Sequence, residues 1–575
     1  MTLFQRAENL SSAKQSRWIM ALGVFALALA LRLQGIDAVP WHPDEGDMAE
    51  VSGAWADGSA AKVGAIRQSA FFPLSASPLA PISAAPFVRL SKQGSLPGLR
   101  LWASCLGALS AAGLLWLAWS LLGPAWGLVA GLALAVNPLA VALQQMGYYH
   151  HLGAALSVLA LPCLFAYLGR PSPRNAAWLG LVCGLAVASA YWLVWLPLLP
   201  LAAILALRRP KDLWYALPAL MAPLGLVALW SHAGDPAGFW GDIHELAKQT
   251  GSDIPIPGLW KPFYGFYKAA QAYPTLGLAA AGLASYAWLD WRRQQRSGAW
   301  IALWAVLTVA EVFRQRQNLE AFSYPLILVL APAAMGIGLA FKSAWELKAS
   351  NGHKAAGYAA LLAVSLATLW TFTRPVTLSW MRLSSAPPAD SNEMLAAVRH
   401  FAAPGDMVIG QPNFNWGLAG SGIQATDLEQ AAVLEGYRGS FLRADFPPQR
   451  FAFTPRLEDA KLLVLSPYTY GISFAEAGPR RLGLRVEMEG WPKVWSNGTY
   501  EIYGNPAKGF PKVKVAALIL KYYNVYDAAA VDAMAAKDWP AARWALTIGS
   551  SSNQGDVAGR KAALAQVLAA MKAAR

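Results

Sequence analysis

The stretch with the most chemical potential follows the first long apolar run and reads Trp41-His42-Pro43-Asp44-Glu45-Gly46-Asp47-Met48-Ala49-Glu50. Proline stiffens the turn before the carboxylates, and apolar residues recur after it at the spacing of a helix that lies along a membrane. Paired carboxylates at the mouth of a membrane cavity act as a general base or hold a divalent cation. Asp44 and Glu45 are therefore the candidate catalytic residues, and Asp44 with Asp47 the candidate ligands of a metal. The alternative is structural, because acidic residues stabilise the first turn of any helix through its dipole.

Two guanidinium groups, Arg314 and Arg316, precede a later apolar run. Guanidinium groups bind phosphate through two parallel hydrogen bonds. At the membrane interface they avoid the cost of about 2.5–3.5 kcal/mol that an arginine meets at the bilayer centre. Glu320, about one helical turn further on, is a candidate for the same cavity. The alternative is that the two cations cap the preceding helix.

A third group of candidates consists of Tyr149, His150 and His151, with Arg100 as a further phosphate candidate. The histidines are suited to binding substrate hydroxyls or phosphate. Because consecutive residues point to different sides of a helix, we do not expect both histidines to hold one metal ion. The alternatives are an interfacial belt of Tyr and His and, for Arg100, a side chain that snorkels to the interface.

The composition places these residues in a membrane protein. The chain has 575 residues, of which 56% are hydrophobic and 14% are charged. Soluble domains average about 25% charged residues, so one large soluble globule and intrinsic disorder are excluded. The three cysteines, Cys105, Cys163 and Cys183, lie in apolar runs without metal-ligand spacing, so we expect no disulfide framework.

Apolar runs long enough to span a bilayer recur as far as about residue 373. We predict eleven spans, at 18–36, 98–122, 125–143, 150–169, 176–191, 192–207, 213–231, 273–290, 299–313, 321–341 and 355–373. With the N-terminus in the cytoplasm, the loops that are then cytoplasmic are basic, which is the positive-inside pattern. This placement accounts for much of the net charge of +14 without nucleic acid. Eleven spans put the C-terminal region outside the cytoplasm.

The predicted fold is mainly α, with about 11 transmembrane helices in residues 1–373 and external loops at 37–97 and 232–272. Residues 385–510 change character and predict a small exported α/β domain. Its expected elements are a helix at 391–403 and strands at 407–410, 461–466 and 499–504. The Ala-rich tail at 511–575 predicts helices that weakly resemble tetratricopeptide pairs, which suggests a protein partner; the alternative is a helical extension packed on the domain.

The acidic pair, the many spans and the exported domain resemble the GT-C superfamily of polyprenyl-phosphate-sugar-dependent glycosyltransferases. The similarity is greatest to the branch with protein O-mannosyltransferases and the lipid A aminoarabinose transferase, and by architecture it covers about residues 15–345. The matching pieces are Leu99-Arg100-Leu101-Trp102, Gly123-Pro124-Ala125-Trp126-Gly127-Leu128-Val129-Ala130, Asn137-Pro138, Trp491-Pro492 and Tyr500-Glu501-Ile502-Tyr503-Gly504-Asn505-Pro506.

The resemblance implies an inverting transfer on the external or periplasmic face of a bacterial inner membrane. Asp44 or Glu45 would take the proton of an acceptor hydroxyl, and Arg314 and Arg316 would hold the phosphate of a polyprenyl-phosphate sugar donor in the membrane lipid. Loop 232–272 would close over that donor; the alternative is a re-entrant or interfacial segment anchored by the aromatic residues of this loop. The acceptor class is open, and no cofactor is required. Gln144 to His151 stand where many relatives carry a second acidic residue, so a bound divalent metal stays an open question.

Two other classes of function remain open. A polytopic transporter of lipid or sugar usually carries ionisable residues or broken helices near the membrane midplane, whereas the candidates here gather at one face. A non-catalytic accessory subunit with GT-C-like architecture is compatible with the missing second acidic position. For the glycosyltransferase we predict a cavity bounded by residues 41–55, 144–151 and 311–324.

Overall fold

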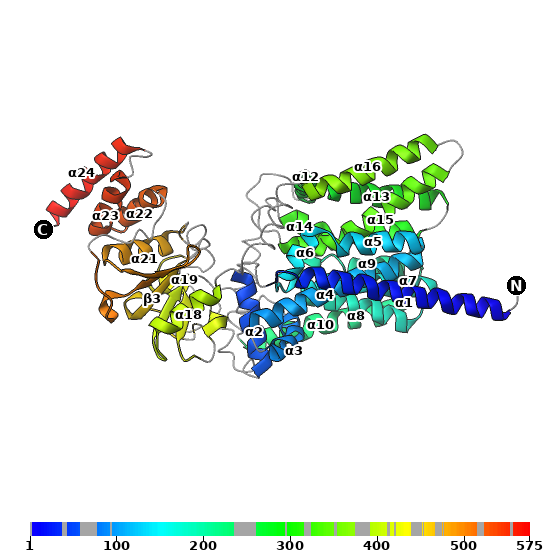
Figure 1. Cartoon of the computed structure of the whole chain (residues 1–575), viewed down its shortest axis with the longest axis horizontal. Coiled ribbons are helices and arrows are strands. Elements are labelled where there is room, and N and C mark those ends of the chain that lie inside the picture. The colour runs from blue at the N-terminus through cyan, green and yellow to red at the C-terminus, as the bar shows by residue number, and fades with distance from the viewer. Residues whose placement is uncertain are drawn as a thin grey trace. The chain divides into compact units, whose positions relative to one another are not determined.

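The computed structural model divides the chain into two compact units (Figure 1). Met1–Val39 and Leu74–Pro388 form the helical unit, and Pro40–Pro73 and Ala389–Arg575 form the sheet unit. The structure describes residues 3–36, 43–57, 78–91, 95–234, 260–293, 296–315, 324–349, 354–373, 391–410, 415–418, 421–438, 451, 453–465, 474, 476–513, 523–551 and 556–574.

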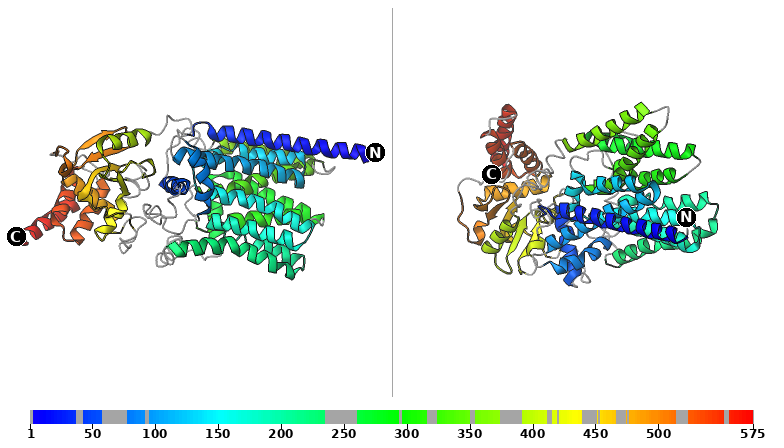
Figure 2. Two further views of the ribbon diagram at one scale, coloured as in Figure 1. Left: turned by 90° about the horizontal axis from the view of Figure 1, so that it is seen from below. Right: turned by 45° about the vertical axis from the view of Figure 1, so that its right-hand side comes forward.

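The helical unit consists of long helices that run alongside one another, as the two views of Figure 2 show. Several of them start with a proline, whose fixed φ suits the first helical position and whose missing N–H costs nothing there. The helices are α1 (Leu3–Leu33), α3 (Leu79–Leu90), α4 (Ser95–Leu122), α5 (Pro124–Ala135), α6 (Pro138–Gln145), α7 (His150–Gly169), α8 (Pro173–Ser189), α9 (Leu198–Ala206), α10 (Leu213–Gly234), α12 (Lys261–Ala272), α13 (Pro274–Arg292), α14 (Ser297–Gln315), α15 (Ile327–Ala349) and α16 (Lys354–Thr373).

Six helices in the described residues are long and apolar enough to cross a membrane, and the bent pair α5 and α6 makes a seventh. The protein is therefore an integral membrane protein by the length and composition of its helices. The remaining apolar helices, such as α9, are shorter. The total of eleven spans stays a prediction.

Two predicted spans differ from the helices observed. The span predicted at 125–143 is broken by a bend of 53° between α5 and α6. The break has a local cause, since Pro138 cannot continue the hydrogen bonding of α5 and the Asn137 side chain accepts from the first amides of α6. The span predicted at 192–207 is a 3-10 turn, η3 (Tyr191–Leu193), followed by the nine-residue α9.

Close helix contacts hold the helical unit together. Gly180 and Gly184 of α8 form a small-xxx-small pair, and a Cβ at either position would meet a backbone carbonyl of α10. Small residues at this spacing let helix backbones approach closely in membranes. Between other helices, the indole nitrogen of Trp304 donates to the carbonyl of Ser157 at 2.8 Å, and both residues are fully buried.

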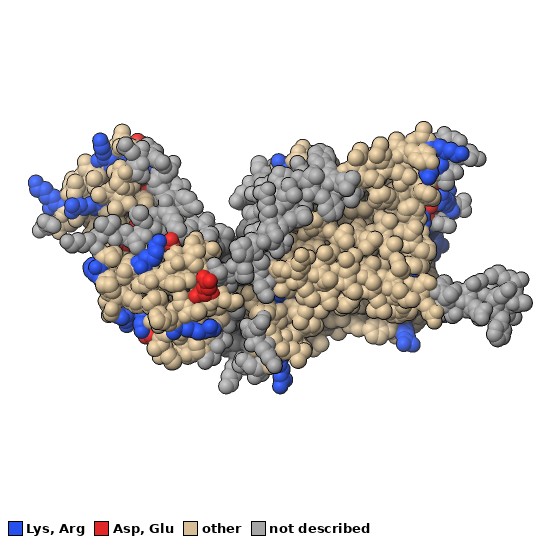
Figure 3. Space-filling model, in the orientation of Figure 1, with Lys and Arg blue, Asp and Glu red and all other residues tan. Residues whose placement is uncertain are grey.

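Charged side chains gather at one end of the helical unit, and the visible side of its helices is nearly free of them (Figure 3). Arg293 pairs with Glu346 at 3.0 Å, and Arg209 pairs with Asp212 at 3.1 Å. These pairs lie in segments that the sequence predicts to be cytoplasmic. An uncharged flank with basic residues at one end is the distribution expected of a protein inserted by the positive-inside rule.

The sheet unit is built on a five-stranded mixed sheet of order β2-β1-β3-β5-β4. β1 (Met407–Gly410) pairs in parallel with β2 (Gln424–Asp427) and β3 (Ala460–Leu465), and β5 (Glu501–Gly504) pairs antiparallel with β3 and β4 (Lys493–Ser496). The unit also contains α2 (Pro43–Asp57), α18 (Ser391–Phe401), η7 (Asn415–Leu418), α19 (Leu428–Leu434), α21 (Ala477–Met488), α22 (Tyr523–Ala535), α23 (Trp539–Ser551) and α24 (Val557–Ala573).

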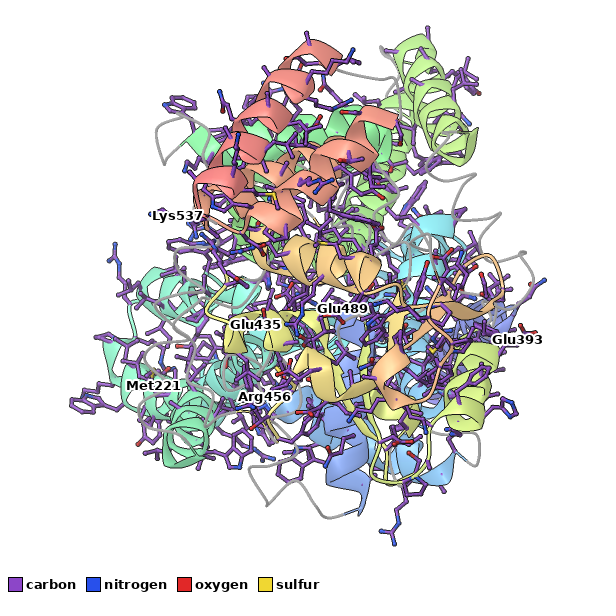
Figure 4. All side chains as sticks on the ribbon, turned by 90° about the vertical axis from the view of Figure 1, so that its left-hand side faces the viewer. Met221, Glu393, Glu435, Arg456, Glu489 and Lys537 are labelled. Carbon is purple, nitrogen blue, oxygen red and sulfur yellow. The ribbon has the colours of Figure 1, made fainter. Side chains whose placement is uncertain are left out.

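The predicted α/β character of residues 385–510 agrees with these elements. The helix and three strands expected from the sequence correspond to α18, β1, β3 and β5 within a few residues, whereas β2 and β4 are additional. The helical tail shares one apolar core with the sheet, to which Leu463, Trp491 and Ala542 all belong. Arg485 of α21 pairs with Glu435 at 2.8 Å and with Glu489 at 3.0 Å, and both carboxylates are labelled in Figure 4. The pair with Glu435 ties α21 to the end of α19, and the pair with Glu489 lies at the end of α21 itself.

Candidate functional site

A buried guanidinium marks the break between α5 and α6. Arg32 of α1 is fully buried, and its Nε and Nη2 donate to Oε1 of Gln144 at 2.9 and 2.6 Å. Its Nη1 and Nη2 groups also donate to the carbonyls of Ala135 and Leu134, each at 3.0 Å, and Nη1 donates to the carbonyl of Ala28 in α1 at 2.8 Å. These carbonyls end α5 and have no partner within that helix, and a cation is favoured at a helix carboxyl end. Arg32 therefore stabilises the broken helix.

The carboxyl end of α1 is held by two other helices. Arg100 of α4 donates from Nη1 to the carbonyl of Ile36 at 2.7 Å, and Gln145 of α6 donates to the carbonyl of Gln34 at 2.7 Å. Arg100 is buried. These bonds fix the point at which the chain leaves α1, eight positions before Asp44. Arg100, a phosphate candidate by sequence, thus holds the start of the segment that carries the acidic motif.

The two histidines at the start of α7 face different neighbours, as expected for consecutive helical residues. His150 is fully buried, stacks on Tyr149 with ring centroids 4.1 Å apart, and lies 6.2 Å from the ring of Trp192. His151 is buried, and its Nε2 hydrogen-bonds with the carbonyl of Met146 at 2.7 Å. Since a carbonyl only accepts, that bond places a proton on Nε2 of His151.

Arg314 is bound by a carboxylate from its own helix. Its Nε donates to Oε2 of Glu311 at 2.8 Å, and its Nη2 donates to Oε1 of the same residue. Oε2 also accepts from the indole nitrogen of Trp195 at 2.9 Å. Glu311 is 4% exposed, whereas the Arg314 side chain is 39% exposed. The carboxylate thus engages the Nε and Nη2 groups along one edge of the guanidinium.

The acidic motif lies on α2 of the sheet unit. Glu45, Met48, Ala49 and Ser52 are all buried and follow one another at the i, i+3, i+4, i+7 spacing of a single helix face. Consecutive helical residues are about 100° apart around the axis. Position 44 is therefore about 100° from Glu45 around the axis of α2 and, four positions before Met48, lies at the edge of this buried face.

Some predicted site residues lie outside the described part of the chain. These are Arg316, Glu320 and most of loop 232–272, together with the side chains of Asp44 and Asp47. The predicted approach of the carboxylates to the guanidiniums, and the cavity around them, stay predictions. Within the described residues there is no group of three His, Cys, Asp or Glu side chains placed to hold a metal ion.

Two charged residues inside predicted spans were not recognised from the sequence as site candidates. Arg32 lies near the outer end of the first predicted span, and Glu311 lies in the ninth. Ionisable residues within membrane segments are rare and are paired or functional, so that rule alone singles out both positions. It does not identify their partners, because Gln144 is 112 positions from Arg32 and Trp195 is 116 positions from Glu311.

Comparison with known proteins bears on the fold. No protein-family model matches the sequence, and no curated protein matches it by sequence. The crystal structure of ArnT from Cupriavidus metallidurans in the apo state is similar at a TM-score of 0.57 and 16% identity, covering 87% of this chain and 100% of ArnT. ArnT bound to undecaprenyl phosphate gives a TM-score of 0.56 at 16% identity, covering 86% of this chain and 99% of ArnT.

A crystal structure of the Archaeoglobus fulgidus oligosaccharyltransferase matches at a TM-score of 0.48 and 15% identity, covering 85% of this chain and 75% of that chain. At 16% identity the likeness to ArnT establishes the fold and leaves the activity to be argued from the site. The protein therefore has the polytopic fold of ArnT, which agrees with the fold that the resemblance in its sequence implies.

Proposed function

We propose that this protein is an integral membrane glycosyltransferase. It transfers a sugar from a polyprenyl-phosphate-linked donor to an acceptor on the non-cytoplasmic face, with inversion at the anomeric carbon. The observation that carries the proposal is the fold shared with ArnT over 86% of this chain, in a crystal structure that holds undecaprenyl phosphate. The acidic motif and the half-exposed Arg314 supply the two chemical groups that such a transfer needs.

The base is best assigned to Asp44. In the transfer, a carboxylate takes the proton of the acceptor hydroxyl while its oxygen forms the new bond to the anomeric carbon. The bond from that carbon to the lipid phosphate breaks on the opposite face, and the phosphate leaves as a stable anion. Glu45 is fully buried on the packed face of α2, which favours a structural role for it. Asp44, at the edge of that face and about 100° from Glu45 around the helix axis, is the better candidate for contact with an acceptor.

In this proposal, Arg314 and Arg316 bind the phosphate of the donor. A guanidinium has five N–H donors, and Glu311 engages those of the Nε edge of Arg314. The opposite edge suits a bidentate bond to phosphate. Because Glu311 cancels the net charge of Arg314, binding at this residue depends on directed hydrogen bonds, and Arg316 would add the second cation. His150 with Tyr149 remains a candidate for contact with the sugar, and Glu320 for the same cavity.

The same proposal includes the orientation of the protein in the membrane. The basic ends of the helical unit would face the cytoplasm, so the sheet unit would be exported, in a bacterial inner membrane. The acceptor is a protein, lipid or glycan of the cell envelope. The tail, α22 to α24, packs on the core of the sheet unit, and a protein partner for it stays part of the proposal.

The test is transfer by the purified full-length protein in detergent from a series of polyprenyl-phosphate sugars. We expect Asp44→Asn to lower kcat by about 10²–10⁴-fold, the usual contribution of a positioned base, with donor binding unchanged. Glu50→Gln removes a carboxylate from the same helix and serves as the matched control, with activity near wild type. Full activity in Asp44→Asn would contradict the assignment. Binding of every donor without transfer by the wild type would favour the accessory subunit.

A further inference from the structure

The helix that carries the acidic motif is packed as part of the sheet unit. α2 belongs with residues 389–575 by its contacts, although more than 330 positions separate it from them along the chain. Among the elements of that unit, α2 contacts η7, the turn between β1 and β2. Its buried face includes Ala49, which is 0% exposed, and Ser52, whose Oγ is buried and makes no hydrogen bond among the described residues. The small side chains at these two positions let that part of the helix approach another backbone closely.

The turn η7 is itself fixed within the sheet unit. Arg399 of α18 donates from Nη2 to the carbonyl of Gly417, and Ser421 Oγ donates to the carbonyl of Leu418 at 2.6 Å. Gly417 lies so close to Leu395 of α18 that any Cβ there would overlap the leucine side chain. Since Leu418 is also buried, η7 has little freedom to move independently of α18 and the sheet.

We propose that the sheet unit positions the catalytic carboxylate, with α2 docked on η7 through the face formed by Glu45, Met48, Ala49 and Ser52. Asp44 then moves with residues 389–575 as one body. This inference rests on the proposed function for its catalytic consequence, but the docking itself does not. Residues of the docking face act on the reaction only through the placement of Asp44. They are positioning residues.

The docking predicts how each side of the contact responds to substitution. Ala49→Leu adds volume to a fully buried position of α2. Overpacking of this kind destabilises the packed helix, and we expect the population of locally opened α2 to rise about ten- to hundred-fold. Ala56→Leu makes the same change at a half-buried position of the same helix and is the matched control. Arg399→Met removes the hydrogen bond to η7 without touching α2. Glu393→Gln, at an exposed position of α18 (Figure 4), is its control.

The experiment is hydrogen exchange of the full-length protein in detergent, read on peptides that cover residues 43–57. We expect faster exchange there in Ala49→Leu and in Arg399→Met, with exchange of β3 unchanged and both controls near wild type. The remote effect of Arg399→Met is decisive, because this side chain donates to the carbonyl of Gly417 in η7, which α2 contacts. Equal exchange of α2 in Arg399→Met and wild type would overturn the docking, as would equal effects of Ala49→Leu and Ala56→Leu.

Kinetics separate the docking from the proposed activity. If both hold, Ala49→Leu lowers kcat at least ten-fold while the Kd for undecaprenyl phosphate stays within two-fold, because the phosphate is bound by other residues. If the wild-type protein transfers no sugar but the variants show the expected exchange pattern, the proposed function is contradicted and the docking of α2 on η7 is supported. A loss of donor affinity equal to the loss of kcat in Ala49→Leu would contradict a positioning role.

Discussion

Arg314 depends on a neighbouring carboxylate for its orientation. Glu311 accepts from its Nε and Nη2 and from the indole of Trp195, so the guanidinium is held by one edge. Glu311→Gln keeps the size of this side chain but removes its charge and one acceptor oxygen. We expect the KM for the donor to rise about ten-fold, which corresponds to about 1.4 kcal/mol, with kcat changed much less. Steady-state kinetics over a donor series measure both.

The control for this variant is Trp195→Phe, which removes the indole donor and leaves the pair of Glu311 and Arg314 in place. Its effect on the donor KM should be smaller than that of Glu311→Gln. An unchanged donor KM in Glu311→Gln would show that Arg314 does not bind the donor, or binds it without help from this carboxylate.

Asp427 makes the stability of the sheet unit depend on pH. It ends β2, is 1% exposed, and its Oδ1 caps α19 by accepting from the amide of Gln430 at 2.7 Å. Burial raises the pKa of this carboxyl from an ordinary value of 3.8 to about 7. Between these values the folded chain keeps a proton that the unfolded chain releases, so stability falls as pH rises from about 4 to about 7. The full loss is on the order of 4 kcal/mol.

Asp427→Asn should remove this dependence. The amide oxygen of asparagine still caps α19, and no charge is buried at neutral pH. Thermal unfolding of the full-length protein at pH 5 and pH 8 measures the effect. We expect the Tm of the sheet unit to fall between these pH values in the wild type and much less in the variant. An equal fall in both would contradict the assignment to Asp427.

At the residue scale, the sequence shows which residues are chemically suited to a site better than it shows which residues they contact. The acidic motif and Arg314 stand out by composition alone, but their neighbours do not. Arg100 is a phosphate candidate in the sequence, whereas in the structure it holds the carbonyl of Ile36. Glu311 and Trp195 meet only because α14 passes the turn before α9, and no local pattern contains that information.

Among the elements, the break between α5 and α6 is stabilised by a buried pair from distant helices. Arg32 donates to Gln144 and to the carbonyl end of α5. Arg32→Met and Gln144→Leu should each lower the Tm, because each leaves buried polar groups unpaired at about 1–3 kcal/mol apiece. The double variant should lose less than the two single losses combined, since each residue has already lost its partner in the other single variant. Thermal unfolding of the four proteins measures this. Additive losses would contradict the coupling.

Helices and strands with an uninterrupted hydrophobic pattern can be predicted from the sequence, whereas interruptions within a helix cannot. The span predicted at 150–169 coincides with α7, and the strand predicted at 407–410 coincides with β1. The interruptions at Pro138 and around η3 were missed because hydropathy continues across them, although the backbone does not. β2 and β4 were missed because four residues are too few to show an alternating pattern.

At the scale of the whole molecule, the polytopic fold was predictable from composition and short motifs, and it is shared with ArnT. The grouping of residues 40–73 with residues 389–575 was not predictable. In the sequence these residues follow the first span and look like part of a membrane loop. The contact of α2 with η7 joins two segments that no local rule connects, and it makes the sheet unit part of the catalytic proposal.

The central claim is that this chain transfers sugar from a lipid phosphate with Asp44 as the base. The most direct measurement is the release of free polyprenyl phosphate, counted against the sugar transferred, by the purified protein and by Asp44→Asn. The account predicts one lipid phosphate released per sugar transferred, an inverted anomeric linkage in the product, and loss of both products in the variant. Continued release and transfer by Asp44→Asn at the wild-type rate would contradict it.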